Sequence, residues 1–567
     1  MSRRAAASLL VAWTSGGDDG NGDGGARRVR IDAPAGASNA AVVRIEEEAA
    51  RGAEAAAAWL GLALPAELAV AVRWFENHEA MGRALGWADL LLDDPRRDAV
   101  MITFGSGRDR QDGIALVDDA RPLALAAEAG ACAALRELVP EATAPMRVAL
   151  AELVAVPGCA AECTALAAAL RAHGLLPTLD HLRGPEPANS PLVIRVSAIS
   201  LLAAQPVATR REALLAAATA EAAWSSALEG AARLESHAPP AVPTALRGFC
   251  FAHEGYRWFD GYGSRASWRS LARAKEIGSN AVSLTPFAFQ RDAKSPTLGA
   301  YVEGDRGGWA AESDASLEVT AADARALGLT VVLKPHVWCG HRRWCGEIEM
   351  DGAEAWAAWF AQYERVAVHY ALLARRCSIP VLCLGTELQG TTRHEKEWRA
   401  LIAKVRALHP GVLTYCANWG EEVERLRFWD ALDVVGVSEY WPLADAPGAD
   451  AAEVERRFGD VLARMRKVGE RAKRPVWFLE IGFADVKEPW LKPSEKAGPF
   501  DGGVDQALAY RLVLTATRRE RFPEGLFWWK WPSDPWRLGP PDRSRDFWPC
   551  DRPAEREVEA AWRGAAK

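Results

Sequence analysis

The stretch Val381 to Leu388 has the sequence Val-Leu-Cys-Leu-Gly-Thr-Glu-Leu, an apolar run that meets polar residues, Thr386 and Glu387, near its end. Apolar side chains on both faces are typical of a parallel strand packed between a core and a layer of helices. A helical pattern precedes the run at Ala353 to Arg376, and another follows it at Glu395 to Leu408. This stretch therefore predicts one strand of an α/β fold with a carboxylate at its carboxyl end.

Short apolar runs of the same kind recur on both sides of this stretch. With Val381 to Leu388 they make eight, the number of strands that closes a (β/α)8 barrel. The other predicted strands are Leu246 to Ala252, Ala281 to Phe287, Val331 to Val337, Gly411 to Asn418, Asp433 to Tyr440, Val476 to Phe483 and Gly525 to Trp531. Further helices are predicted at Ser267 to Ile277, Thr320 to Leu327, Ala451 to Ala472 and Val504 to Arg518.

A chain of 567 residues exceeds what one compact core usually holds, so we expect more than one domain. Residues 236–245 are rich in proline, which cannot continue a helix, and we interpret them as a linker. We therefore expect a TIM barrel over residues 246–567, preceded by a mostly helical α+β domain over residues 29–235. Residues 1–28 form a signal-like segment and a flexible Gly/Asp-rich tether.

The Ala- and Leu-rich domain shows helical periodicity in four stretches and strand-like runs in three. The helices are predicted at Ala40 to Leu60, Leu123 to Leu138, Met146 to Leu170 and Arg210 to Leu234, and the strands at Ala69 to Trp74, Ala99 to Phe104 and Gly113 to Val117. Glu152 lies where a weakly similar zinc-peptidase fold has its His-Glu-x-x-His helix, but Ala151 and Ala155 replace both histidines. The alternative is an ordinary amphipathic helix with one solvated glutamate. Neither interpretation predicts chemistry there.

The N-terminus has two arginines followed by the short apolar stretch Ala5 to Ala12. Such a stretch resembles an export signal and is too short to span a bilayer. Leu10 to Trp13 resembles the lipobox of bacterial lipoproteins, but Trp13 stands at the position of the lipidated cysteine, which argues against a lipid anchor. The alternative is a disordered tail. We expect an exported protein, in the periplasm, at the cell surface or secreted.

The composition excludes two classes of partner. A net charge of −7 and a pI near 5.9 argue against nucleic acid and anionic membranes. The ten cysteines match neither a zinc pattern nor a small disulfide scaffold. Cys250, Cys383 and Cys416 are expected to be buried thiols, whereas the pairs Cys339 with Cys345 and Cys159 with Cys163 could each bridge in an oxidising compartment.

Tryptophan is concentrated in the predicted barrel, because only Trp13, Trp59, Trp74, Trp87 and Trp224 of the 24 tryptophans precede Leu246. An indole offers a flat apolar face that stacks on the C–H surface of a sugar, although a large barrel also buries aromatic side chains. Polar and aromatic residues end most of the predicted strands, on the face where barrel enzymes have their active sites. These residues are Lys334, His336, Glu387, Asn418, Trp419, Glu439, Tyr440, Glu480, Trp528, Trp529 and Trp531.

Glu387 and Glu480 end the fourth and seventh predicted strands, which lie nearly across the barrel mouth from each other. Hydrolysis of a glycosidic bond with retention needs two carboxyl groups about 5 to 5.5 Å apart, one as acid/base and one as nucleophile. The acid must be protonated near neutral pH while the nucleophile stays ionised. Glu439 is a third carboxylate, which either disturbs this balance or faces away from the site on the strand pleat.

Residues 247–531 resemble glycoside hydrolase family 113, a retaining family whose known members include endo-β-1,4-mannanases. The matching segments are Leu333 to His336, Trp344 to Ile348, Gly385 to Leu388, Tyr415 to Trp419, Phe428 to Asp433, Tyr440 to Leu443 and Leu479 to Phe483. The relatives of the wider clan often have asparagine before the acid/base, where this chain has Thr386, a departure that family 113 tolerates.

The resemblance implies that Glu387 is the acid/base, that Glu480 is the nucleophile and that Tyr440 keeps Glu480 ionised through a hydrogen bond. Substrate binding is assigned to His336, Asn418, Trp419, Tyr440, Trp529, Trp531 and Lys334. The expected activity is retaining hydrolysis of a β-linked, mannan-like polysaccharide or oligosaccharide, without metal or organic cofactor. One alternative is a non-catalytic carbohydrate-binding barrel on an exported protein. Another is a scaffolding role led by the first domain.

Overall fold

The computed structural model describes residues 8–12, 29–32, 39–64, 70–75, 101–103, 141–183, 190–215, 220–232, 241–253, 261–300, 314–341, 343–535 and 545–564, and some others, mostly between 126 and 139. The chain divides into two compact units. The first comprises Met1–Ser236, Gly263–Arg265 and Val302–Val319, and the second comprises His237–Tyr262, Ala266–Tyr301 and Thr320–Lys567. The division between Ser236 and His237 falls in the segment interpreted as a linker.

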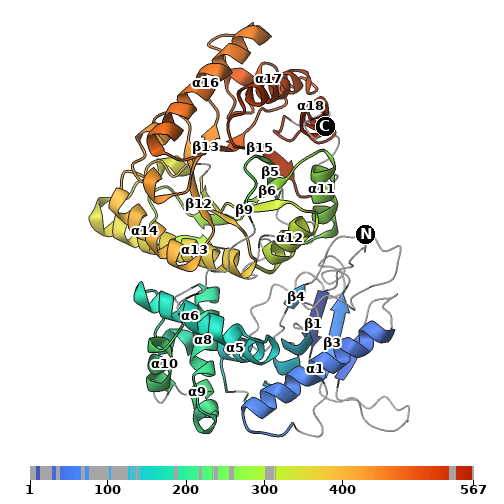
Figure 1. The fold of residues 1–567 in the computed structure, drawn as a ribbon, viewed down its shortest axis with the longest axis vertical. Coiled ribbons are helices and arrows are strands. Elements are labelled where there is room, and N and C mark those ends of the chain that lie inside the picture. Colours follow the sequence, from blue (N-terminus) through green and yellow to red (C-terminus); the bar gives the residue numbers. More distant parts are fainter. Residues whose placement is uncertain are drawn as a thin grey trace. The chain divides into compact units, whose positions relative to one another are not determined.

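Eight parallel strands of the second unit form a closed barrel, which confirms the predicted fold (Figure 1). Each neighbour in the ring is the next predicted strand along the chain, and the last strand pairs with the first. The barrel strands are β5 (Leu246–Ala252), β6 (Ala281–Leu284), β9 (Thr330–Leu333), β11 (Val381–Thr386), β12 (Val412–Asn418), β13 (Val434–Glu439), β14 (Val476–Ile481) and β15 (Gly525–Pro532).

Two of the predicted strands, Ala281 to Phe287 and Val331 to Val337, are in fact interrupted at Pro286 and Pro335. Proline has no N–H for the ladder, so each barrel strand ends before it and a new strand starts after it. The new strands, β7 (Phe287–Gln290) and β10 (His336–Cys339), pair in parallel, and β8 (Leu298–Ala300) pairs antiparallel with β7. This three-stranded sheet continues from the carboxyl ends of β6 and β9.

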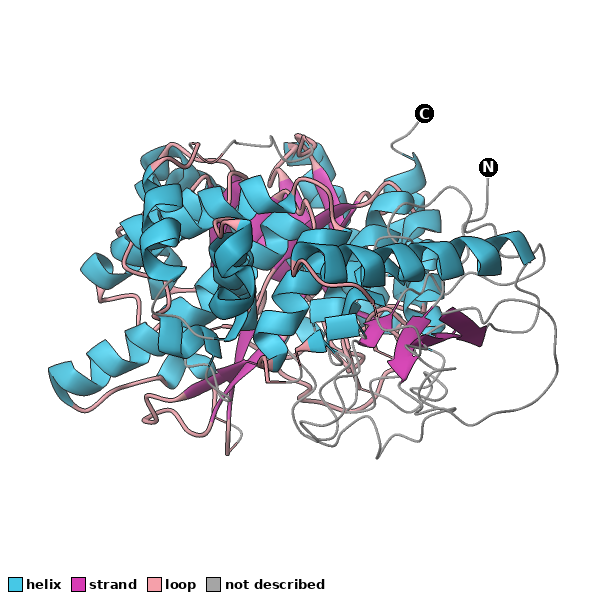
Figure 2. Cartoon of the chain, turned by 90° about the horizontal axis from the view of Figure 1, so that it is seen from below, coloured by secondary structure: helices cyan, strands magenta, loops and turns pink. Residues whose placement is uncertain are grey.

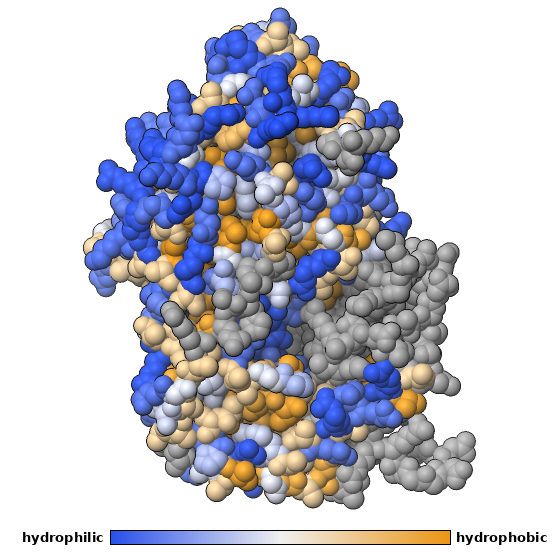
Figure 3. Space-filling view, in the orientation of Figure 1, coloured by the Kyte–Doolittle hydropathy of each residue, from blue (hydrophilic) through white to orange (hydrophobic). Residues whose placement is uncertain are grey.

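Helices surround the barrel (Figure 1). Most of the predicted helices have bounds close to those observed, but α12 begins at Asp314 instead of Thr320, and α15 and α18 were not predicted. In α16, which Asp450 caps, the side chains Val454, Phe458 and Met465 are buried while the opposite side is charged. Figure 3 shows a largely hydrophilic surface over α14 and α16. The helices are α11 (Arg265–Glu276), α12 (Asp314–Ala326), α13 (Gly352–Arg376), α14 (Glu395–Leu408), α15 (Glu421–Arg425), α16 (Ala451–Ala472), α17 (Val504–Glu520) and α18 (Pro553–Gly564).

The first unit combines helices with a four-stranded sheet of order β2-β3-β1-β4. Figure 2 colours the helices of the chain cyan and its strands magenta. The apolar stretch interpreted as part of an export signal contains β1, which lies between β3 and β4. The strands are β1 (Ser8–Ala12), β2 (Val29–Asp32), β3 (Val70–Phe75) and β4 (Met101–Thr103). The helices are α1 (Asn39–Trp59), α5 (Ala144–Ala155), α6 (Cys159–Ala172), α7 (Leu179–Arg183), α8 (Pro191–Ala203), α9 (Arg210–Leu215) and α10 (Ala220–Glu229).

The predicted helix Met146 to Leu170 is two helices, because Pro157 and Gly158 interrupt it and Gly158 adopts a left-handed conformation (φ 83°). The predicted strand Gly113 to Val117 lies outside the described residues. The helix α8, which is buried over most of its length, and the strands β1 and β2 were not predicted.

Glu152 on α5 is not the solvated glutamate of the simpler interpretation. Its side chain is buried and forms an ion pair of 2.5 Å with Arg195 of α8, which also pairs with buried Glu128 at 2.6 Å. A buried carboxylate requires such a counter-ion. Among the residues that the structure describes, no group of three His, Cys, Asp or Glu side chains could hold a metal ion. No described helix is long and apolar enough to cross a membrane.

Candidate active site

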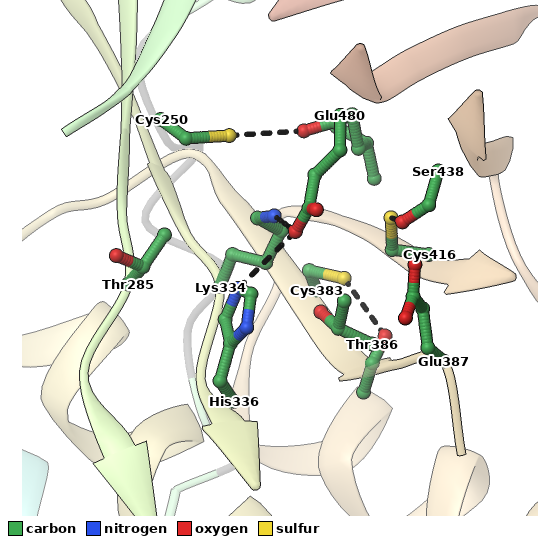
Figure 4. Close-up of polar contacts among 12 residues, drawn as sticks. Cys250, Thr285, Lys334, His336, Cys383, Thr386, Glu387, Cys416, Ser438 and Glu480 are labelled. Carbon is green, nitrogen blue, oxygen red and sulfur yellow. Dashed lines mark hydrogen bonds and ion pairs between the residues drawn. The ribbon is translucent and has the colours of Figure 1, made fainter. Parts of the chain in front are cut away.

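Glu480 lies near the carboxyl end of β14, where it is almost fully buried. The Lys334 ammonium donates a hydrogen bond to its Oε1, and the Tyr440 hydroxyl donates one of 3.3 Å to its Oε2. The His336 Nε2 is 3.4 Å from Oε1. Figure 4 shows Lys334 and His336 both reaching this carboxylate. One carboxylate is thus held by a cation and a hydroxyl at the bottom of the site.

The position of Lys334 argues against the substrate-binding role that was predicted for it. Its side chain is fully buried, so its contact is with Glu480 rather than with a ligand in the mouth of the barrel. Burial alone lowers the pKa of this ammonium, but the neighbouring Cys250 and Glu480 raise it, and the net pKa is above the ordinary value. Burial raises the pKa of the Cys250 thiol to about 12, so Cys250 is neutral near pH 7. Glu480 is therefore the charge partner of Lys334.

His336 stacks on Trp529, with ring centroids 5.6 Å apart and an interplanar angle of 27°. Burial, and then the charge of Lys334, lower the pKa of this imidazole well below its ordinary value. The ring is consequently neutral near pH 7. Its Nε2 has no hydrogen-bond partner in the described part of the chain. A neutral imidazole beside Glu480 can exchange hydrogen bonds with a hydroxyl group of a ligand.

Glu387 follows β11 directly and has a left-handed backbone (φ 54°), which is uncommon for a side chain of this size. Its N–H donates to the carbonyl of Cys416 on the neighbouring strand at 2.8 Å. Its Oε2 accepts a hydrogen bond of 2.7 Å from the Trp344 indole. Figure 4 shows its carboxylate beside Ser438, on the other side of the site from Lys334.

The environment of Glu387 favours the protonated acid. Burial and then the charge of Glu480 raise its pKa, while hydrogen bonds from Trp344 and Ser438 and the charge of Lys334 lower it. The net pKa is about 7. A carboxylic acid with this pKa can hold its proton near neutrality and release it to a leaving group. The two glutamates therefore have opposed surroundings, one paired with an ammonium and the other desolvated.

Tyr440, Trp419 and Trp529 belong to one apolar cluster at the mouth of the barrel, together with Phe547. Trp419 and Trp529 are partly exposed, which is compatible with the substrate contact predicted for them. Asn418 is half-buried, and its amide donates to Gln389 at 3.3 Å. The structure thus brings these three predicted aromatic residues together near Glu480.

Trp531 and Trp528 lie apart from this site. Trp531 is fully buried, its indole N–H donates to the Ser270 hydroxyl of α11 at 2.8 Å, and its ring is 4.6 Å from Phe249. Trp528 is equally buried and stacks on Tyr510 of α17 at 3.8 Å. Side chains alternate along a regular strand, so Trp531 would be expected to point into the site as Trp529 does. The pairing of β15 with β5, however, shifts register between Trp528 and Trp531. Both side chains pack against helices instead of binding substrate.

Glu439 faces away from the site. It is buried, and burial raises the pKa of its carboxyl to about 8, with only the Trp441 backbone acting in the opposite direction. Its neighbours in sequence, Ser438 on β13 and Tyr440 directly after it, contact Glu387 and Glu480 respectively. Because successive side chains on a strand alternate, Glu439 lies on the other face. It does not disturb the balance between the catalytic pair.

Two residues of the site were not predicted as functional. Trp344, in the segment after β10, contacts Glu387 directly. Glu422 is buried and accepts hydrogen bonds from the Tyr415 hydroxyl (2.8 Å) and the Asn418 backbone (2.6 Å). The Tyr415 hydroxyl in turn accepts a hydrogen bond of 2.8 Å from the backbone N–H of Leu388. This chain of bonds fixes the backbone that carries Glu387, and no local sequence signal identifies it.

The ten cysteines are all free thiols in the structure, including the two pairs that could bridge. Cys250, Cys383 and Cys416 are buried in the barrel interior, as expected. Cys345 is close to the backbone carbonyls of Thr386 and Glu387, at 3.6 and 3.7 Å. Burial, followed by the charge of Glu387, raises the pKa of Cys345 well above its ordinary value. This thiol is therefore protonated near pH 7 and lies next to Glu387.

A closed parallel barrel with two glutamates at the ends of its fourth and seventh strands, one charge-paired and one desolvated, defines the class of TIM-barrel glycosidases. The sequence model of Glycoside Hydrolase Family 113 matches residues 250–551, just over half of the chain. The chain belongs to glycoside hydrolase family 113, and it is a glycosidase.

Similar solved structures include three from the same family. A family 113 β-mannanase from Alicyclobacillus acidocaldarius, in complex with ManMIm, is 29% identical, with a TM-score of 0.49 over 56% of this chain and 97% of that chain. A complex of a family 113 β-1,4-mannanase is 25% identical, with a TM-score of 0.49 over 56% and 99% of the two chains. Another β-1,4-mannanase of the family is 27% identical, with a TM-score of 0.49 over 56% and 98%. No curated protein matches the chain.

Proposed function

We propose that the barrel hydrolyses a β-1,4-linked, mannan-like polysaccharide or oligosaccharide with retention of configuration. The observation that carries the proposal is the contrast between the two glutamates. Glu480 is paired with a buried ammonium, whereas burial and the charge of Glu480 raise the pKa of Glu387 to about 7. The sugar class is an inference from the family, whose known members include endo-β-1,4-mannanases.

In the first step, a Glu480 oxygen attacks the anomeric carbon while Glu387 gives its proton to the glycosidic oxygen, so the bond to the leaving sugar breaks. In the second step, the Glu387 carboxylate takes a proton from water, and the water oxygen displaces Glu480 from the same carbon. Both glutamates return to their starting states. Two inversions give a product with the configuration of the substrate.

The other residues of the site support these steps. Lys334 and Tyr440 keep Glu480 ionised and oriented before attack. Trp344 positions the acid, because its N–H holds one Glu387 oxygen. His336 and Trp529 provide a flat, neutral surface for the sugar at the cleavage point.

The test is hydrolysis of β-linked mannan, glucan, xylan and galactan by the full chain and by Glu480→Gln. We expect activity on mannan and manno-oligosaccharides and its loss in the variant. NMR of the first product should show the β anomer, whereas an α product would exclude retention. Binding of mannan without turnover by the native chain would contradict catalysis and favour a binding barrel.

The roles of the two glutamates can be separated with azide and an activated aryl β-manno-oligosaccharide. Azide should rescue Glu387→Ala and give a β-glycosyl azide, because the covalent intermediate still forms. It should rescue Glu480→Ala with an α-glycosyl azide, because azide then attacks directly. The reverse pattern would exchange the assignments.

We also propose that the protein is exported, because a polysaccharide substrate would be found outside the cytoplasm. Cell fractionation tests this location. Sequencing of the mature N-terminus then decides whether Ser8 to Ala12 remain, since cleavage after them would remove β1 from the sheet of the first unit. A protein found only in the cytoplasm would contradict export.

A further inference from the structure

The three-stranded sheet of β10, β7 and β8 has one buried face and one open face. The side chains of Ala288, Gln290, Val337 and Cys339 are buried. The alternate positions are partly or well exposed, and Trp338 is 49% exposed. We call this open side the aromatic face; its residues are Phe287, Phe289, His336 and Trp338.

Gly299 of β8 stands at the edge of the aromatic face. Gly299 on β8 pairs with Phe289, and a side chain placed at Gly299 would meet no atom within 4 Å. Glycine thus leaves open space beside the phenyl ring. Leaving the Trp338 indole about half exposed is unfavourable in water, because apolar area removed from water is worth about 25 cal/mol per Å².

The aromatic face is continuous with the active site through a chain of ring contacts. Trp529 stacks on His336 at 5.6 Å, His336 is 5.3 Å from Phe287, and Phe287 is 5.9 Å from Trp338 in an edge geometry. His336 is also 3.4 Å from the Glu480 carboxylate. The rings therefore extend outward from the cleavage point along the sheet.

We propose that the aromatic face is a binding platform for the hexopyranose units of the substrate that lie beyond the cleavage point, with Trp338 as its outer ring. This inference rests on the proposed function, and it adds a preference for chains longer than the sugars held at the catalytic glutamates. Sugar rings stack their C–H faces on indole and phenyl rings, and such contacts need no charge. His336 is the titratable side chain of the aromatic face, and its lowered pKa keeps it neutral near pH 7. The four side chains of this face therefore carry no charge.

The experiment compares kcat/KM for manno-oligosaccharides of increasing length between the native chain and Trp338→Ala. The kcat/KM of the native enzyme should increase with substrate length. On the longest substrates, the kcat/KM of the variant should be roughly five- to tenfold lower than that of the native enzyme. Trp338→Phe should restore part of it, because a smaller ring still stacks. Val207→Ala, which removes an exposed hydrophobic side chain of the first unit, is the control and should leave the length dependence unchanged.

An equal loss at every length would show that Trp338 acts on folding or on the catalytic centre, and no loss at any length would show that the platform binds nothing. A native enzyme that cleaves glucan or xylan instead of mannan would overturn the proposed sugar, but the length dependence could still be measured on that chain. Titration of Glu480→Gln, with and without Trp338→Ala, measures binding apart from turnover. Concentration-dependent self-association that Trp338→Ala abolishes, with unchanged affinity for oligosaccharides, would identify a second copy as the occupant.

Discussion

At the scale of single residues, the site depends on two carboxyl groups of the same type in different surroundings. Glu480 has an ammonium and a phenol as partners, and Glu387 has an indole and partial burial. Desolvation favours the neutral acid, and a nearby cation favours the anion. The acid and nucleophile roles proposed for the two glutamates therefore follow from their different neighbours, since the side chains themselves are identical.

Lys334 is the residue that we expect to control the nucleophile. Lys334→Met should lower kcat/KM about 100-fold or more, because a buried carboxylate without its counter-ion becomes protonated more easily. For the same reason, the acidic limb of the kcat/KM profile should move to higher pH. The measurement is the pH profile of the variant.

Lys334→Arg is the matched control, since it keeps the positive charge next to Glu480. It should retain more activity than Lys334→Met and leave the acidic limb near its original pH. If both variants lose activity equally with no change in the limb, Lys334 has only a packing role.

Trp344 should influence the pKa of Glu387, the proposed acid/base. Its N–H stabilises the ionised form of Glu387 and lowers its pKa from the value that burial would give. Trp344→Phe removes this bond, so the pKa of Glu387 should rise above about 7, and the basic limb of kcat/KM should shift upward by about one pH unit or less. A pH–rate profile measures the shift. A limb that moves downward would mean that the indole raises the pKa instead.

At the scale of elements, short interruptions decide which side chains meet. Pro286 and Pro335 end two barrel strands and start the sheet that carries the aromatic face. The register shift in β15 places Trp529 in the site but Trp531 against α11. Each of these interruptions involves one or two residues, and each changes the direction in which the following side chains point.

Because Trp531 packs outward against α11, its substitution should change the stability of the protein and not its catalysis. Trp531→Phe should reduce the free energy of unfolding by about 1 to 2 kcal/mol, because it loses the bond to Ser270 and leaves a small cavity. Its KM should not change. Trp529→Ala should instead lower kcat/KM at least tenfold, since Trp529 stacks on His336. Denaturant unfolding and steady-state kinetics of both variants separate the two roles, and a raised KM for Trp531→Phe would contradict its placement.

At the scale of the whole molecule, the catalytic machinery belongs to the second unit, and the first unit has its own core and its own buried ion pairs. The mechanism proposed for the barrel needs two carboxyl groups, a water molecule and the sugar. It needs neither a metal nor an organic cofactor.

Prolonged dialysis of the full chain against EDTA should therefore leave the rate of polysaccharide hydrolysis unchanged. Added zinc should leave the melting temperature unchanged as well, because alanine occupies the positions on α5 where ligand histidines would be needed. Measurement of activity and Tm before and after chelation checks both expectations. Loss of activity that a divalent cation restores would show that the chain contains a metal site.

Much of the architecture follows from the sequence alone. Eight apolar runs with intervening helical periodicity predicted the closed barrel, and Glu387 and Glu480 stood at the ends of its fourth and seventh strands. The resemblance to family 113 assigned their roles. Periodicity and position along the chain are local properties, so they can be recognised without coordinates.

Only the tertiary structure decided which partners each side chain meets. It buried Lys334 beneath Glu480, turned Trp531 away from the site, and brought Trp344 to Glu387. It also placed Arg195 between Glu128 and Glu152 in the first unit. These outcomes depend on strand register and on residues far apart in sequence, because burial and charge pairing are set by the packed neighbours and not by the order of the chain.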